Sequence, residues 1–185
     1  MNHSDELKPA FGAGRKFFHW TIAALLLVQI PLAWYMIELP LGPDKLGKYV
    51  LHKSMGMLLF TLAVSRLVWA LISQRPALPA SIPRWEKLVA KLSQALLYIL
   101  VILMPVTGWL MSSAANVPVV IFGLIRLPNL VEPDKTFMEG MQSAHEIQSI
   151  LLLILIGGHL LAALKHHFLS RNDILRSMLP LQSKR

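Results

Sequence analysis

Four long apolar segments, separated by short polar ones, dominate the chain. They cover roughly residues 17–37, 50–73, 92–113 and 147–168, and each meets the length of about 20 residues that a helix needs to cross the hydrocarbon layer of a bilayer. Because unpaired backbone groups cannot face lipid, these segments are predicted to be helices. The pattern predicts an all-α fold, an integral membrane four-helix bundle, with residues 1–185 forming a single domain without internal repeats.

The composition supports a membrane protein over a soluble one. Hydrophobic residues make up 55% of the chain, and the mean hydropathy is +0.54. The absence of cysteine excludes disulfides, thiolate metal sites, iron–sulfur clusters and thioether-attached haem. The net charge of +8 comes from basic residues between the apolar segments. We therefore expect contacts with membrane lipid and no nucleic acid as a partner.

The distribution of basic residues predicts the orientation. They gather in the N-terminal segment, in the connection between the second and third apolar segments, and in the C-terminal tail, whereas the other two connections carry both signs of charge. The positive-inside rule then places both termini in the cytoplasm. The first 16 residues lack the short apolar core of a cleaved signal peptide. The apolar part of the loop at 114–139 is expected to lie along the outer surface as a short interfacial element.

Histidines occur at two matching depths. His145 and His159 are 14 residues apart, which returns to within about 40° of the same helix face and separates them by roughly 21 Å. His52 opens the second apolar segment on the outer side and matches His145 in depth. His19 lies at the cytoplasmic end of the first segment. Its partner is either His159 or His166, since depth alone does not choose between them.

Two pairs of imidazoles from separate helices, one above the other, match the requirement of two haems with two histidine ligands each. Neutral imidazole is a good axial ligand for iron, and two such ligands leave no open position for oxygen or substrate. Small residues beside the histidines leave room for a flat macrocycle; they are Gly56, Gly157, Gly158, Ala162 and Ala163.

Other interpretations stay open at this point. A single interfacial histidine is more often a headgroup contact, and a glycine pair more often marks close helix packing. Zinc or copper would also accept imidazole, but no third ligand such as an acid stands beside either pair inside the membrane. The alternative from another class is a small proton or metal transporter that uses intramembrane histidines. Proton relays usually include membrane-embedded acids, and none of the four segments contains one in its interior.

Two further residues are candidates for a site on the cytoplasmic side. Arg66 lies 14 residues after His52 and shares its face; a buried arginine needs an anion, either a haem propionate or a quinone oxygen, unless it snorkels to the interface. His166 lies at the cytoplasmic surface, where it either serves a quinone that takes up protons or is a solvated histidine beside His167. Basic residues near the outer pair steer an anionic reactant, contact haem propionates or are ordinary solvated loop residues: Lys45, Lys48 and Lys53.

The sequence resembles the bacterial cytochrome b561 family from about Arg15 to Leu179. The matching stretches are FFHW, LHKSMG, SRLVW, SAHEIQS and GGHLLAALKHHF, followed by RNDILRSMLP. The resemblance implies a multi-pass di-haem b-type cytochrome of the bacterial inner membrane. It implies His19 and His159 as ligands of the inner haem iron, His52 and His145 as ligands of the outer one, and a quinone near His166.

The resemblance also implies a function. We expect a membrane oxidoreductase that transfers electrons between a periplasmic reactant and the quinone pool, with ubiquinone-type quinone as a bound substrate. Superoxide is one candidate for the periplasmic donor, which would make the protein a superoxide–quinone oxidoreductase. A related expectation is a membrane anchor and electron outlet for a separate dehydrogenase partner.

Overall fold

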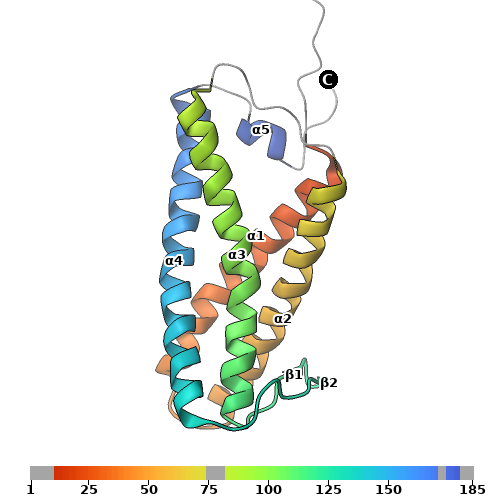
Figure 1. Ribbon diagram of the computed structural model, residues 1–185, viewed down its shortest axis with the longest axis vertical. Helices are drawn as coiled ribbons and strands as arrows, with labels where there is room; N and C mark the ends of the chain where they lie inside the picture. The colour runs from red at the N-terminus through yellow and green to blue at the C-terminus, as the bar shows by residue number, and fades with distance from the viewer. Residues whose placement is uncertain (1–10, 74–81, 171–173, 180–185) are drawn as a thin grey trace, which may run out of the picture.

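Four long helices form the body of the molecule in the computed structural model, which describes residues 11–73, 82–170 and 174–179. They are α1 (Ala13–Glu38), α2 (Pro43–Ile72), α3 (Arg84–Ala114) and α4 (Lys135–Phe168), followed by the short helix α5 (Ile174–Met178). All four long helices are long and apolar enough to cross a membrane. The predicted all-α membrane bundle is therefore confirmed (Figure 1).

Each long helix begins before the apolar segment predicted for it, and α2 ends one residue before its segment does. α4 begins at Lys135, where the side chain of Asp134 accepts a hydrogen bond of 2.9 Å from the backbone N–H of Phe137. Such a capping residue satisfies a helix N–H that has no intrahelical partner. α2 begins with Pro43, a residue whose fixed φ suits the first helical turn. Polar helical turns therefore precede the apolar segments of both helices.

The helices pack in chain order. α1 packs on α2, α2 on α3, and α3 on α4. Among the described residues, α4 makes no extensive backbone contact with either α1 or α2. Many large apolar side chains face outward, for example Leu27 (76% exposed), Leu71 (78%) and Leu161 (68%). A water-soluble protein of this size would bury such side chains, so lipid is their expected surrounding.

The beginning of α1 and the end of α4 lie at the same end of the bundle, together with α5 (Figure 1). We call this the terminal end. α5 is fastened to α1 there, because Trp20 Nε1 donates to the carbonyl oxygen of Met178 at 2.8 Å and Lys16 Nζ to that of Leu179 at 2.9 Å. The two ends of the described chain therefore lie at one end of the bundle.

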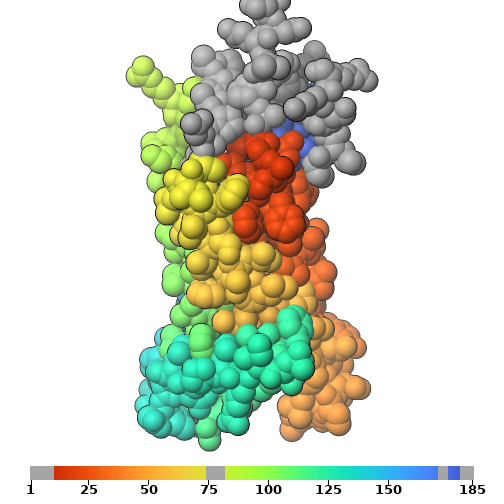
Figure 2. All heavy atoms as spheres, turned by 90° about the vertical axis from the view of Figure 1, so that its right-hand side faces the viewer, coloured from red at the N-terminus to blue at the C-terminus, as the bar shows by residue number. Residues whose placement is uncertain are grey.

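The segment between α3 and α4, residues 115–134, closes the opposite end, which we call the loop end. It contains a two-stranded antiparallel ribbon, β1 (Val120–Ile121) and β2 (Ile125–Arg126). The turn of the ribbon places Phe122 and Gly123 at φ of 48° and 74°, as in the turns that match the twist of a hairpin. Figure 2 shows this segment, in blue-green, spread over the loop end beside the start of α2.

A buried serine joins this ribbon to α2. The Ser54 hydroxyl accepts from the backbone N–H of Phe122 at 2.8 Å, and its oxygen lies 3.3 Å from the carbonyl oxygen of Val120. Ser54 has no exposed surface. The apolar tip remains exposed, with Leu124 at 86% and Ile125 at 60%. The sequence predicted an interfacial element here but not its strand pairing.

Candidate functional site

The first pair of candidate ligands lies toward the terminal end, and we call it the inner pair. His19 comes from α1 and His159 from α4, and their ring centroids are 6.3 Å apart with the ring planes at 62°. A metal ion bonded to a nitrogen of each ring at about 2 Å places the centroids roughly 6 Å apart. Because α1 and α4 make no extensive backbone contact in the described part of the chain, the two rings face each other across a gap between helices. This geometry fits an axially ligated haem.

The second pair, the outer pair, lies toward the loop end. His52 on α2 is close enough to His145 on α4 to interact with it electrostatically. Nδ1 of His52 is buried and has no hydrogen-bond partner within the described ranges, so no hydrogen bond in this part of the chain fixes the orientation of its ring. Nδ1 of His145 lies 3.1 Å from Oγ1 of Thr107, which leaves Nε2 as the nitrogen available for a metal. These residues also fit a group held between two imidazoles.

Arg66 lies at the level of the inner pair. It is within electrostatic range of both His19 and His159, and its guanidinium lies 5.2 Å from the centre of the Tyr98 ring on α3. α2 therefore contributes His52 at one level and Arg66 at the other. A cation at this position attracts an anionic or acceptor group beside the inner pair.

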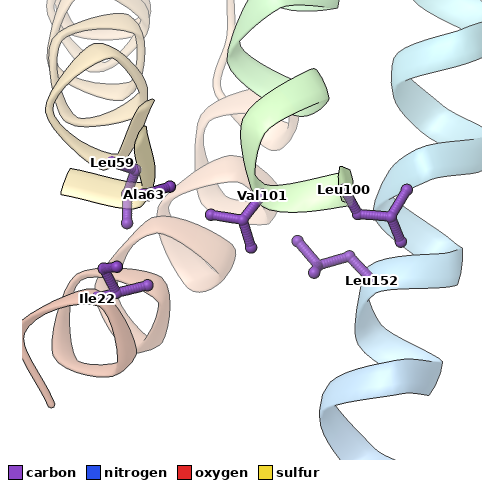
Figure 3. Close-up of a cluster of buried hydrophobic side chains, with 6 residues drawn as sticks. All are labelled: Ile22, Leu59, Ala63, Leu100, Val101 and Leu152. Carbon is purple, nitrogen blue, oxygen red and sulfur yellow. The ribbon is translucent and has the colours of Figure 1, made fainter. Parts of the chain in front are cut away.

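A layer of apolar side chains separates the two pairs. Its buried members come from all four long helices and pack on one another (Figure 3): Ile22, Leu59, Ala63, Leu100, Val101 and Leu152. Leu152 is 4% exposed and lies seven residues from His145 and seven from His159. The described cluster at the middle of the bundle is thus apolar and without charge, and on α4 the histidines lie on either side of it.

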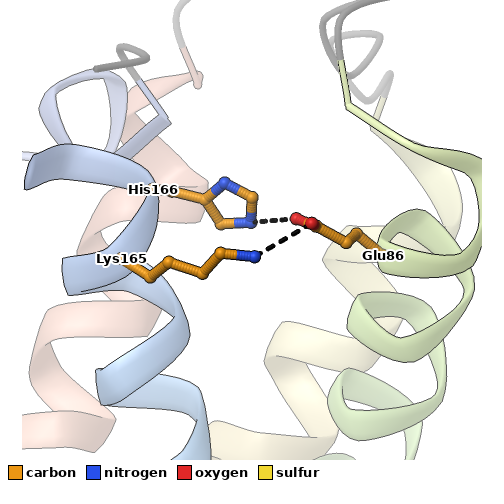
Figure 4. A network of polar contacts seen from close by, with 3 residues as sticks. All are labelled: Glu86, Lys165 and His166. Carbon is orange, nitrogen blue, oxygen red and sulfur yellow. Dashed lines mark hydrogen bonds and ion pairs between the residues drawn. The ribbon is translucent and has the colours of Figure 1, made fainter. Parts of the chain in front are cut away.

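His166 belongs to an ionic network at the terminal end (Figure 4). Its Nε2 lies 3.6 Å from Oε2 of Glu86, and Lys165 Nζ lies 2.9 Å from Oε1 of the same carboxylate. The side chains of Glu86 and His166 are only 15% and 16% exposed. Glu86 therefore joins the start of α3 to the end of α4, and His166 is no fully solvated histidine.

A groove runs along the lipid-facing side of α3 next to α2. It has a volume of about 490 Å³ and is bordered at one end by Lys91 and Gln94, in the middle by Tyr98, and farther along by Ile102 and Leu103. Its polar side chains lie toward the terminal end, and its apolar ones lie toward the middle of the bundle. Tyr98 connects this groove to Arg66.

The three lysines near the outer pair do not share one role. Lys45 Nζ donates to the carbonyl oxygens of Ile37 and Leu39 at 3.0 and 2.8 Å. It therefore satisfies acceptors at the end of α1, which is a structural role. Lys48 and Lys53 lie on the same helix, α2, on either side of the turn that leads to His52.

Four polar residues of this region escaped the sequence analysis. Thr107 and Gln148 contact each other behind His145, Gln29 Nε2 donates to the carbonyl oxygen of His52 at 2.9 Å, and Glu86 pairs with the end of α4. Three of them interrupt apolar segments, and a polar side chain within a membrane helix usually needs a partner. That rule, applied to every interruption, would have singled out Gln29, Thr107 and Gln148.

A membrane bundle of four helices with paired histidines between them has the architecture of a membrane cytochrome. Within the described residues, no three His, Cys, Asp or Glu side chains gather into an alternative metal site. The chain matches the family model of the prokaryotic cytochrome b561 over residues 10–181, and it belongs to that family. Membership implies b-type haem and electron transfer in a bacterial inner membrane.

Individual relatives agree with this assignment. The chain is 29% identical over 170 residues to cytochrome b561 homolog 2 of Escherichia coli (strain K12), covering 91% of this chain and 90% of that protein. It is 26% identical over 168 residues to the probable superoxide oxidase CybB of Yersinia pestis, covering 88% and 91%. A third relative, cytochrome b561 homolog 1 of Escherichia coli (strain K12), is 25% identical over 180 residues, covering 92% and 97%.

Proposed function

We propose that this protein is a di-haem b-type cytochrome that transfers electrons between a periplasmic reactant and the quinone pool. The observation that carries the proposal is the arrangement of four histidines as an inner and an outer pair, each formed across helices that are not in extensive backbone contact. His19 and His159 would hold the inner haem, and His52 and His145 the outer one. A haem with two imidazole ligands supplies one-electron chemistry without an open coordination position.

The orientation proposed for the protein places the terminal end in the cytoplasm. Basic side chains are frequent there, and the positive-inside rule assigns such an end to the cytoplasmic side. The inner pair then faces the cytoplasm, and the outer pair and the ribbon of residues 115–134 face the periplasm. The fastening of α5 to α1 supports a common side for both termini.

The quinone is proposed to react on the cytoplasmic side. Arg66 offers a cation at the level of the inner pair, to a haem propionate or to a quinone oxygen. His166, held near Glu86, is a candidate to hydrogen-bond the quinone and to deliver a proton. The groove beside Tyr98 is apolar toward the bundle centre and polar toward the terminal end, which suits an isoprenoid chain attached to a polar ring.

The periplasmic reactant is proposed to be a small one-electron donor, with superoxide as the first candidate. One relative is named as a probable superoxide oxidase. Lys48 and Lys53 lie on α2 near His52 and add positive charge at this end, which attracts an anion. The protein would then act as a superoxide–quinone oxidoreductase. A dehydrogenase partner that docks at the periplasmic face would use the same outer pair.

Ligand substitutions test the proposal. The purified protein should show a b-type spectrum that dithionite reduces, with two haems per chain by pyridine haemochrome analysis. His52→Ala and His145→Ala should each remove one haem, and they should leave the other with its native spectrum, because the apolar layer separates the pairs. His167→Ala is the matched control, since this histidine belongs to neither pair.

Two results would contradict this proposal. A colourless, folded protein would favour a transporter that uses intramembrane histidines. Retention of both haems in both outer variants would show that these residues are not ligands. Stopped-flow mixing of the oxidised protein with superoxide, and of the reduced protein with a ubiquinone analogue, then tests the two proposed reactants separately.

A further inference from the structure

Behind His145 lies a small polar network that the family assignment does not explain. Thr107 on α3 is 8% exposed. Its Oγ1 lies 3.1 Å from Nδ1 of His145, 3.0 Å from Oε1 of Gln148 and 2.9 Å from the carbonyl oxygen of Met104. The network therefore connects α3 to the outer ligand candidate on α4, inside an otherwise apolar part of the bundle.

The direction of these hydrogen bonds follows from the chemistry of the partners. Oε1 of Gln148 and the carbonyl oxygen of Met104 can only accept. The single hydrogen of the Thr107 hydroxyl goes to one of them, and its lone pairs remain free to accept. The Met104 carbonyl oxygen also faces the His145 ring. In the tautomer that binds a metal through Nε2, Nδ1 of His145 carries the hydrogen and donates it to Thr107 Oγ1.

We propose that Thr107, supported by Gln148, is a positioning residue that fixes the tautomer and orientation of His145 and lowers the reduction potential of the outer haem. This inference rests on the proposed function, in which His145 is a haem ligand. An acceptor for Nδ1–H makes the imidazole a more basic ligand. A more basic ligand favours ferric over ferrous iron. Donation from Thr107 to Gln148 increases the negative charge on the hydroxyl oxygen and strengthens this effect.

The other candidate ligands lack such support. Nδ1 of His52 has no hydrogen-bond partner in the described part of the chain. His19 and His159 contact aromatic rings, including each other, but no hydrogen bond to their ring nitrogens is found among the described residues. The Thr107 network thus acts on one ligand of one pair. The inner pair provides an internal reference in any measurement of the whole protein.

The test compares Thr107→Val, which removes the hydroxyl at nearly constant size, with Thr107→Ser, which keeps it. Both variants are purified with haem and titrated by anaerobic spectroelectrochemistry, with electron paramagnetic resonance of the ferric low-spin signals. His145→Ala identifies which redox transition belongs to the outer pair. We expect Thr107→Val to raise the potential of that transition alone, Thr107→Ser to match the native protein, and Gln148→Leu to cause a smaller upward shift.

The outcomes separate this inference from the one on which it rests. If His145→Ala removes a haem but Thr107→Val leaves both potentials and both signals unchanged, the Thr107 inference is wrong and the ligand assignment stands. If His145→Ala keeps both haems, the ligand assignment itself fails. Loss of the outer haem in Thr107→Val, with retention in Thr107→Ser, would support the role of the hydroxyl. Equal loss in both variants would overturn it, because packing would then be the cause.

Discussion

Gly108→Ala is expected to disturb the outer pair through a single methyl group. A Cβ at this position would lie 3.3 Å from Cε1 and 3.6 Å from Nδ1 of His145, and the first distance is shorter than the optimum of about 3.5–4.0 Å for carbon atoms. The ring must move by a few tenths of an ångström away from α3. Because Thr107 Oγ1 holds the same ring at 3.1 Å, this movement stretches the hydrogen bond that orients it.

Gly108→Ala is expected to change the free energy of unfolding only slightly, but to act directly on the outer pair. Replacing glycine by alanine inside a helix stabilises the helix by about 1 kcal/mol, whereas inserting a methyl group into a packed site costs about 1–3 kcal/mol. The net change in the free energy of unfolding then lies between roughly zero and 2 kcal/mol of destabilisation. Gly140→Ala is the matched control, because Gly140 is also helical and its added Cβ meets nothing within 4 Å.

The assay rests on the proposed di-haem assignment and measures the haem content per chain together with the electron paramagnetic resonance signal of each haem. Gly108→Ala should lose the outer haem in part or shift its signal, and leave the inner one unchanged. Gly140→Ala should keep both haems and a thermal midpoint at or above that of the native protein. If the two variants behave alike in haem content, in both signals and in thermal midpoint, then α3 does not position His145 in the way described.

Three further substitutions address other parts of the molecule. Gly14→Ala places a Cβ 2.7 Å from the Trp69 indole, so the contact between α1 and α2 should loosen and the thermal midpoint should fall; an unchanged midpoint would contradict this packing. Glu86→Gln removes an ion pair whose lysine, Lys165, is 45% exposed, so the loss should be at most about 1 kcal/mol and should shrink at high salt; a loss that salt does not change would point to a buried role. Arg66→Leu removes a positive charge beside the inner pair and should lower the reduction potential of a haem bound there. The expected loss of electrostatic stabilisation of the reduced haem is about 1–2 kcal/mol, for a charge at roughly 10 Å and an effective dielectric constant of about 20. An unchanged potential and unchanged quinone reduction would return Arg66 to a snorkelling role.

The hydropathy pattern predicted the four helices but not their full lengths. Hydropathy reports where lipid begins, whereas a helix ends where its backbone groups find other partners. α4 illustrates the difference: its apolar segment was placed from residue 147, but the helix begins at Lys135 because Asp134 caps it there. The two-residue strands of 115–134 escaped prediction for a related reason, since they depend on Ser54, a residue more than 60 positions away.

The depth of the histidines could be predicted from the sequence, because the 14-residue spacing of His145 and His159 gives their separation along a helix and because His19 and His52 lie at the ends of apolar segments. Their supporting residues were not predictable in the same way. Thr107 and Gln148 matter through contacts between α3 and α4, and the sequence does not give the rotation of one helix against another. The same limit left the choice between His159 and His166 open until a resemblance decided it. In the structure, the ring of His159 faces His19, and His166 contacts Glu86 instead.

The apolar layer at the centre of the bundle keeps the two histidine levels apart, and this separation determines how strongly the transmembrane voltage acts on a charge that moves between them. The histidines of α4 lie roughly 21 Å apart along the axis, about two-thirds of a hydrocarbon layer of about 30 Å. In the proposed di-haem mechanism, an electron that moves between these levels without a compensating proton crosses a similar share of the transmembrane voltage. At about 2.3 kcal/mol per charge and 100 mV, that is roughly 1.6 kcal/mol for every 100 mV. The turnover of this protein in energised vesicles should therefore respond to ionophores that collapse the voltage.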